Sequence, residues 1–248
     1  MADFAKNGFL NSLLPADRKH LEAHASLTTL IHGKQLQEQR ARVEHVYFPL
    51  SGIISLLAVM KNGTAVESAL VSASGAAGIA VGLGIPLAIS RAVVQAPGSA
   101  LRISAAHFLK IAKQSATLVM RVGVHQENLL AQVQQTAACN SVHTAEQRLA
   151  RWLLQAQDNI ADGELIPFTH EFLSNILGVR RSTVTLIAAA LQRAGSIRYV
   201  RGRIEILDRP ALKRTACECY EVIRILSGQG LKPELSRGKG KDTRFVRG

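Results

Sequence analysis

Residues 170–189 constrain the fold of this chain most strongly, because their spacing predicts two short helices joined by a tight turn. Gly178 is the pivot, since glycine readily adopts the positive φ that ends one helix and lets the chain turn into the next. Leu173 and Leu177 lie four residues apart on the first helix, and apolar residues recur at steps of three and four on the second. This spacing is typical of a DNA-binding helix-turn-helix, whose second helix lies in the major groove.

Charge near the second helix favours this hypothesis over an ordinary helical hairpin, which the apolar spacing alone allows equally. Residues 180–203 contain six arginines and no carboxylate, whereas a solvated face normally mixes both signs. The natural partner of such a segment is a polyanion. After Gly195, residues 197–200 and 203–207 predict two short strands around Arg201 and Gly202. The sequence thus predicts a small wing with a basic tip.

The chain has 248 residues and a net charge of +12, which is enough length for two domains. Its three cysteines form no disulfide framework in a chain of this size and, with no signal peptide, favour a cytoplasmic location. Residues 68–90 carry no charge and are long enough to span a bilayer. They contain several glycines, a proline and few bulky apolar residues, so a buried glycine-rich segment is expected and a membrane span is not.

Residues 10–104 predict a compact antiparallel β-roll, with a short helix that begins at Pro15 ahead of its strands. Short apolar, β-branched runs at residues 28–31, 46–50, 53–60 and 64–71 indicate its strands. Asn62 and Gly63 separate the last two runs. Asn-Gly between such runs is the strongest short hairpin signal, so a hairpin is expected there.

Residues 105–140 predict one long helix, with apolar residues at steps of three and four over about four heptads and Ser115 in one heptad place. It would form either a seam between two subunits or a core helix packed on its own β-roll. A homodimer is favoured, because one helix-turn-helix reads only half of a palindromic site. The residues expected at the seam are Ile111, Leu118, Val122 and Leu129.

The remaining segments complete a DNA-binding domain over residues 141–226. A helix at residues 142–157 leads to the reader, and residues 210–226 are expected to be helical and to cap the winged domain. Residues 227–248 are rich in Gly, Lys and Arg, which predicts a disordered basic tail that adds non-specific phosphate contacts.

The order of these parts, with R-L-A-R-W-L-L followed by T-H-E-F-L-S-N-I-L-G-V-R-R-S-T-V, resembles the Crp/Fnr superfamily of bacterial transcription regulators over about residues 10–225. The residues that match the reader motif of that family are Thr169, Leu173, Ile176, Gly178, Arg181, Thr183, Val184 and Ile187. The resemblance implies an α+β fold: a jelly-roll sensor like a cyclic-nucleotide-binding domain, a dimerisation helix, and a winged helix-turn-helix. It also implies that Arg181 reads a guanine while Thr169 and Thr183 hold phosphates.

The expected DNA-binding residues lie at the start of the reader helices and on the wing. They are Thr169, His170, Arg180, Arg181, Ser182, Thr183, Thr185, Leu186, Arg201 and Arg203. Two of them depart from the family pattern, because Ser182 and Leu186 stand where many members carry a glutamate and an arginine or serine. The usual operator sequence is therefore not expected.

The sensor departs from the family as well. Cyclic-nucleotide binders in the family carry a glutamate for the ribose and an arginine for the cyclic phosphate. Here residues 75–78 read Gly-Ala-Ala-Gly, so the glutamate is missing, while Arg91-Ala92 keeps the arginine. The candidate effector-binding residues are Gly75, Gly78, Arg91 and Ala92. The expected effector is something other than cyclic AMP, or there is none.

These observations favour a cytoplasmic, homodimeric transcription regulator that binds a palindromic double-stranded operator, with RNA polymerase as a candidate partner. The rival hypotheses are a small-molecule sensing module with incidental DNA contact, and an enzyme, for which no catalytic residue is found. Neither a cofactor nor a metal is expected. His20 and His24 lack a third ligand, Cys217 and Cys219 are interpreted as a half-buried pair, and the cysteines of an iron–sulfur sensor are absent.

Overall fold

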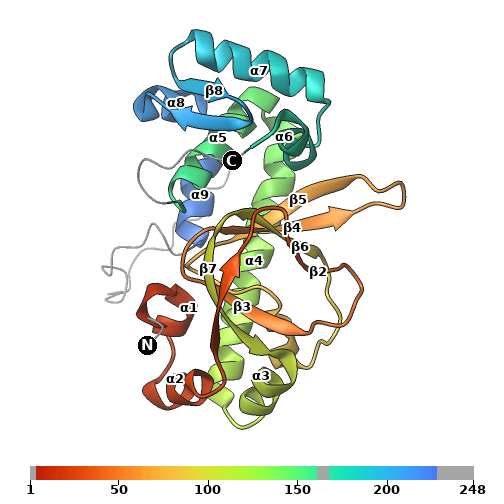
Figure 1. Ribbon diagram of the computed structural model, residues 1–248, viewed down its shortest axis with the longest axis vertical. Helices are drawn as coiled ribbons and strands as arrows, with labels where there is room; N and C mark the ends of the chain where they lie inside the picture. The colour runs from red at the N-terminus through yellow and green to blue at the C-terminus, as the bar shows by residue number, and fades with distance from the viewer. Residues whose placement is uncertain (1–3, 161–167, 228–248) are drawn as a thin grey trace, which may run out of the picture.

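The computed structural model describes residues 4–160 and 168–227. An N-terminal β-roll and a C-terminal helical domain lie along one long helix, α4 (Ala116–Val142), which runs through the centre of the molecule (Figure 1). The C-terminal domain occupies one end of the molecule, and the short helices α2 (Pro15–Glu22) and α3 (Ala105–Ala112) lie at the other. This arrangement matches the predicted α+β architecture.

The β-roll consists of two antiparallel sheets. One has the strand order β1-β7-β3, with β1 (Ser26–Leu30), β7 (Gly98–Ser104) and β3 (His45–Pro49). The other has the order β2-β6-β4-β5, with β2 (Gln35–Gln37), β6 (Arg91–Ala96), β4 (Ile53–Val59) and β5 (Ala65–Val71). The predicted hairpin is confirmed, because β4 pairs with β5 across a turn in which Gly63 has φ +85°.

The N-terminus closes one side of the roll. It forms a short 3₁₀ turn, η1 (Phe4–Lys6), then α1 (Gly8–Asn11) and α2. The buried Asn7 fixes this segment, because its side-chain amide donates to the Pro49 and Gly75 carbonyls while its oxygen accepts from the Leu10 amide. Each polar atom of this buried amide thus has a partner.

The uncharged residues 68–90 belong to the roll. After β5 they form a short 3₁₀ helix, η2 (Ile79–Leu83), which is bounded by Gly78 and Gly84, both in the left-handed region. Among the helices in the described part of the chain, none combines the length and apolar character needed to cross a bilayer.

The prediction of a single helix over residues 105–140 is wrong, because the helical structure is interrupted between α3 and α4. Ser115 caps α4 by accepting a hydrogen bond of 3.1 Å from the Leu118 amide. A serine is a strong N-cap, because its side-chain oxygen accepts from an amide that lacks a partner within the helix. The serine interpreted as a weak heptad position is therefore a helix start.

The C-terminal domain contains α5 (Ala145–Gln157), α6 (His170–Leu177), α7 (Arg181–Arg193), the strands β8 (Ile197–Val200) and β9 (Arg203–Ile206), and then α8 (Arg209–Thr215) and α9 (Cys219–Leu226). Trp152 and Phe168 are fully buried at its centre. The segment 210–226 forms two helices, because α8 ends at Thr215 and α9 begins at Cys219. The predicted tail, apart from Ser227, lies outside the described residues.

Candidate nucleic-acid interface and ligand cavity

The turn between α6 and α7 has the predicted geometry. Thr169 caps α6 by accepting from the Phe172 amide at 3.2 Å. Gly178 ends the helix with φ +62°, and α7 begins three residues later with Arg180 as its N-cap. Leu173 and Val184 are buried between the helices, so their facing apolar stripes hold the pair as the spacing predicted.

The first turn of α7 is the exposed, positively charged part of this domain. Figure 1 shows α7 at the end of the molecule remote from the β-roll. Arg180, Arg181, Ser182 and Thr185 are exposed, and the Leu186 side chain is 72% exposed. Thr183 is half-buried. An exposed helix start with two arginines and small hydroxyl residues can meet both base edges and phosphates.

The wing adds further positive charge. Arg201 and Gly202 form its turn with φ of +50° and +76°, and the tip lies beside the start of α6, because a Cβ on Gly202 would lie 3.6 Å from Thr169 Cγ2. Among the ion pairs of the described residues, none involves Arg180, Arg181, Arg201 or Arg203.

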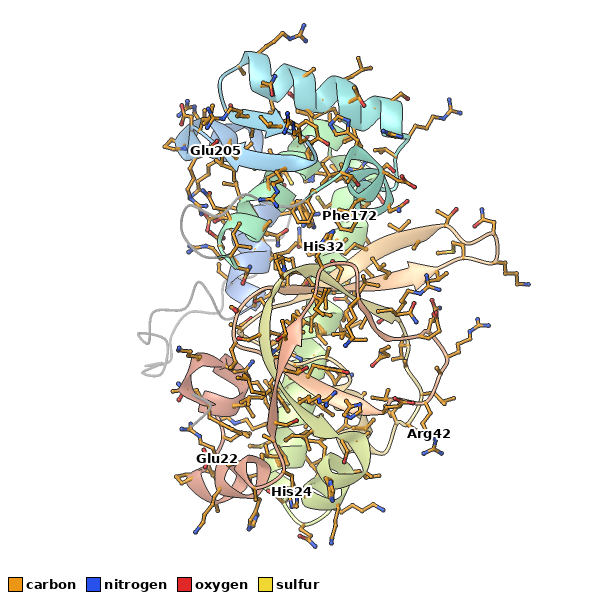
Figure 2. The ribbon with its side chains drawn as sticks, viewed as in Figure 1. Glu22, His24, His32, Arg42, Phe172 and Glu205 are labelled. Atoms are coloured by element: carbon orange, nitrogen blue, oxygen red, sulfur yellow. The ribbon has the colours of Figure 1, made fainter. Side chains whose placement is uncertain are left out.

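Arg198 is the exception on the wing. It pairs with Glu205 on the neighbouring strand, and Figure 2 shows Glu205 on that part of the domain. One of the six arginines of residues 180–203 is therefore paired with a carboxylate that lies just outside this segment.

His170 has a different place from the one expected. Its ring stacks on Tyr199 with centroids 4.3 Å apart, and its Nδ1 lies 3.0 Å from the Thr185 hydroxyl, which in turn donates to the Arg181 carbonyl. Burial, with the nearby charge of Arg181, lowers the pKa of His170. His170 therefore connects α6, α7 and the wing. Sequence reasoning missed Tyr199, because its partner is distant along the chain.

A cavity of about 440 Å³ lies between the β-roll and α4. Its lining is mostly apolar, with Gln37, Ser68, Ser90 and Gln126 as the residues with polar side chains. The other lining residues are Val43, Leu56, Ala58, Ala69, Ala76, Ala77, Gly78, Ile79, Ala80, Leu87, Ala88, Ile89, Leu129, Leu130 and Val133. A concave site of this size and composition suits a small apolar molecule.

Of the four candidate effector residues, the structure places only Gly78 on this cavity. Gly75 packs against His125, whose Cε1 lies 2.6 Å from the position of a Cβ there, and Ala92 is buried. Arg91 forms a bidentate pair with Glu38, with its Nη2 2.8 Å and its Nε 3.0 Å from the carboxylate oxygens. This hydrogen bonding lowers the pKa of Glu38. The fork that could hold a phosphate is already occupied by a carboxylate.

Strand β5 links the cavity to the C-terminal domain. Ser68 lines the cavity, and its neighbour Glu67 points to the other side of the strand, where it accepts a hydrogen bond of 2.8 Å from the Trp152 indole and another from the Ser55 hydroxyl. Burial raises the pKa of Glu67. Val66 lies next to Gly178 in the reader turn. One strand thus touches the cavity, the core of the reader domain and its turn.

The predicted dimer seam is placed differently. Leu118 and Val122 are fully buried against Phe108 and Ile111 in the core of the roll, while Leu129 lines the cavity. These side chains pack within their own chain, as expected from the alternative interpretation of a core helix packed on its own β-roll. The exposed large apolar side chains of α4 are Met120, Val124, Leu130 and, at its C-terminal end, Val142, which are 59%, 50%, 48% and 77% exposed.

Comparisons with known proteins identify similar folds. Residues 147–215 match the model of the Crp-like helix-turn-helix domain. A transcriptional regulator of the Crp/Fnr family from Eubacterium rectale is 18% identical, covers 85% of this chain and 98% of its own, and has a TM-score of 0.67. A Crp/Fnr regulator from Thermus thermophilus is 23% identical over 77% of this chain and 98% of its own, with a TM-score of 0.63. FixK2 from Bradyrhizobium japonicum is 15% identical over 78% and 98%, with a TM-score of 0.63. No curated protein sequence matches the chain.

Proposed function

Residues 147–215 form a Crp-like helix-turn-helix domain in a chain with the Crp/Fnr regulator fold, and from this premise we propose a homodimeric transcription regulator that reads a palindromic operator. The exposed first turn of α7 carries this proposal, because its arginines are free of carboxylate partners among the described residues. The protein acts on DNA in the cytoplasm and has no catalytic role. RNA polymerase is a further partner in this scheme, with no contact assigned.

In the complex, α7 enters the major groove with its N-terminus at the base edges. Arg181 donates two hydrogen bonds to a guanine, and Thr169 and Thr183 contact the flanking phosphates. Arg201 and Arg203 hold the backbone from the wing. His170 positions α7 and the wing and does not contact the bases, because its Nδ1 and its ring are engaged by Thr185 and Tyr199.

Dimerisation uses the exposed face of α4. Met120 and Val124 lie one turn apart and exposed on a helix of 27 residues, and burying them against a second copy removes that surface from water. Two parallel copies of α4 would present two readers to the two halves of a palindrome.

The effector that fits the cavity is small and apolar. Cyclic AMP does not fit, because Glu38 occupies the Arg91 fork and the lining offers few polar partners for a ribose or a phosphate. A ligand against Ser68 and Ala69 can shift β5, and with it Glu67 and Val66, which touch the reader domain. The cavity also favours the second candidate function, a sensing module with incidental DNA contact.

Selection of bound sequences from random DNA with the purified protein tests the proposal. We expect enrichment of a palindrome, and its loss for Arg181→Ala. The matched control is Arg193→Ala at the far end of α7, which keeps the enriched sequence. Binding of random DNA with no enriched sequence would favour the sensing module.

A further inference from the structure

Three cysteines and one histidine that are far apart in the sequence meet at the junction of α4, α5 and α9. Cys139 lies in the last turn of α4, and His143 follows directly as its C-cap. Cys217 lies between α8 and α9, and Cys219 is the first residue of α9, which packs against α4 and α5 (Figure 1). All three thiols are buried, and the four potential ligand atoms lie within 4.8 Å of one another. We propose that Cys139, His143, Cys217 and Cys219 form a binding site for a structural Zn²⁺ ion.

Two of the distances between ligand atoms agree with a tetrahedral zinc ion. Zn–S bonds of about 2.3 Å and Zn–N bonds of about 2.0 Å place neighbouring ligand atoms roughly 3.5–3.8 Å apart. Here the Cys139 and Cys217 sulfurs are 3.5 Å apart, and the Cys219 sulfur is 3.6 Å from His143 Nδ1. Four protein ligands close the coordination sphere, which is typical of a structural site and leaves no position for a substrate. Thiolates favour Zn²⁺ over hard cations such as Mg²⁺ and Ca²⁺.

The surrounding groups hold the ligands in the orientation that a metal requires. His143 Nε2 lies 3.2 Å from the Glu218 carboxylate, so the proton is held at Nε2 and the Nδ1 lone pair is free for a metal. This is the carboxylate–histidine arrangement that supports zinc ligands. The Gln135 amide donates to the Cys219 sulfur at 3.0 Å. These contacts form a second layer around the cluster.

The charge around the cluster also suits three thiolates. Three thiolates and one Zn²⁺ leave a net charge of −1. Arg148 and Arg151 lie close enough to interact electrostatically with this negative charge. A buried site of this charge needs such cations nearby, because an uncompensated buried charge is costly. The arginines and the carboxylate thus complete a charge-balanced site.

Zinc at this position would fasten two parts of the chain. Cys139 and Cys217 are 78 residues apart, and between them lies the helix-turn-helix. A metal that bridges them closes the domain onto the end of α4, and the free energy of metal binding then adds to folding stability. The site would therefore hold the end of α4 against the start of α9.

Metal titration of the intact, reduced protein tests the site without reference to DNA. After treatment with a chelator, the chain should take up one Zn²⁺ per polypeptide, and its Tm should rise. Co²⁺ in place of Zn²⁺ should give the visible bands of tetrahedral coordination and near-ultraviolet thiolate-to-cobalt charge transfer. Folded, reduced protein that takes up no stoichiometric metal, or an octahedral cobalt spectrum, would overturn the proposal.

Variants distinguish the ligands from their neighbours. Cys217→Ser and His143→Ala should lose stoichiometric binding, and Glu218→Gln should weaken the affinity about 10- to 100-fold by releasing the histidine. His20→Ala is the matched control, because this exposed histidine lies on α2 and its removal should leave binding unchanged. Circular dichroism checks that each variant folds. If the reduced wild type binds no metal but forms a Cys139–Cys217 disulfide on oxidation, the cluster is a redox pair and not a zinc site.

Discussion

Arg181 and Arg91 are the arginines that the family resemblance assigns to ligand contact, one in each domain, and the structure treats them differently. Arg181 lies exposed at the start of α7 without an ion pair among the described residues. Arg91 is held by Glu38 through three hydrogen bonds. The comparison teaches that a motif residue indicates a ligand only where its charge is free. The first turn of α7 therefore has free positive charge, whereas the arginine of the β-roll is paired and the cavity of the roll has a mostly apolar lining.

The largest effect on stability is expected at Leu118, which the sequence predicted at the dimer interface and which the structure buries in the core of the β-roll. Leu118→Glu places an unpaired charge in the core of the roll, and should lower the free energy of unfolding by at least about 3 kcal/mol. Met120→Glu, two residues along the same helix, is exposed and should leave the fold intact while it weakens dimerisation. Chemical denaturation and sedimentation measure the two effects. Equal loss of stability in both variants would contradict this assignment of the faces of α4.

The next effect concerns the free arginine of the reader. Arg181→Ala should reduce specific affinity for the selected operator by about 1–3 kcal/mol and leave random DNA almost unaffected. The double variant Arg201→Gln/Arg203→Gln should weaken both and lower the salt slope by about 1.8, or roughly 0.9 per phosphate contact. Binding titrations at several salt concentrations measure both. A loss for Arg181→Ala that is the same on both DNAs would show that it contacts phosphate only.

A smaller effect is expected from pH in the sensor domain. Burial lowers the pKa of His125, opposed by a hydrogen bond to the Ala76 carbonyl. The unfolded chain therefore binds a proton at higher pH than the folded chain, and stability is complete above about pH 6.5 and falls as the pH drops below it. One such group changes stability by at most about 1.4 kcal/mol per pH unit. His125→Gln should flatten this dependence in thermal unfolding from pH 7 to 5, whereas an unchanged slope would assign it to other groups.

The smallest effect is expected for cyclic AMP. Calorimetry should detect no binding by the wild type at micromolar concentrations, because the Arg91 fork is occupied and the cavity lacks polar partners. Glu38→Gln removes the competing charge and should produce at most weak binding, since one released arginine contributes modestly. Micromolar binding by the wild type that Arg91→Ala abolishes would show that the β-roll has a cyclic-nucleotide site that uses Arg91.

Local patterns were sufficient for several elements. Asn62-Gly63 predicted the β4–β5 hairpin, and Gly178 with its flanking leucines predicted the reader turn, because each depends on a backbone conformation that few residues adopt. The prediction of one long helix failed at Ser115, because the same serine can occupy a heptad position or cap the start of a new helix, and periodicity does not distinguish the two. The prediction of which face of α4 forms the dimer seam failed, because periodicity shows which residues share a face of the helix and does not show what packs against that face.

By itself the sequence determined the helix-turn-helix, the basic wing, the hairpin of the roll and the missing glutamate of the sensor, since these depend on residues that are neighbours along the chain. Only the tertiary structure showed that Glu38 pairs with Arg91, that Leu118 packs in the core of the β-roll of its own chain, and that His170 packs on Tyr199. It also brought Cys139 and His143 to Cys217 and Cys219. These contacts join residues from different elements, and only the packed fold places such side chains within bonding distance.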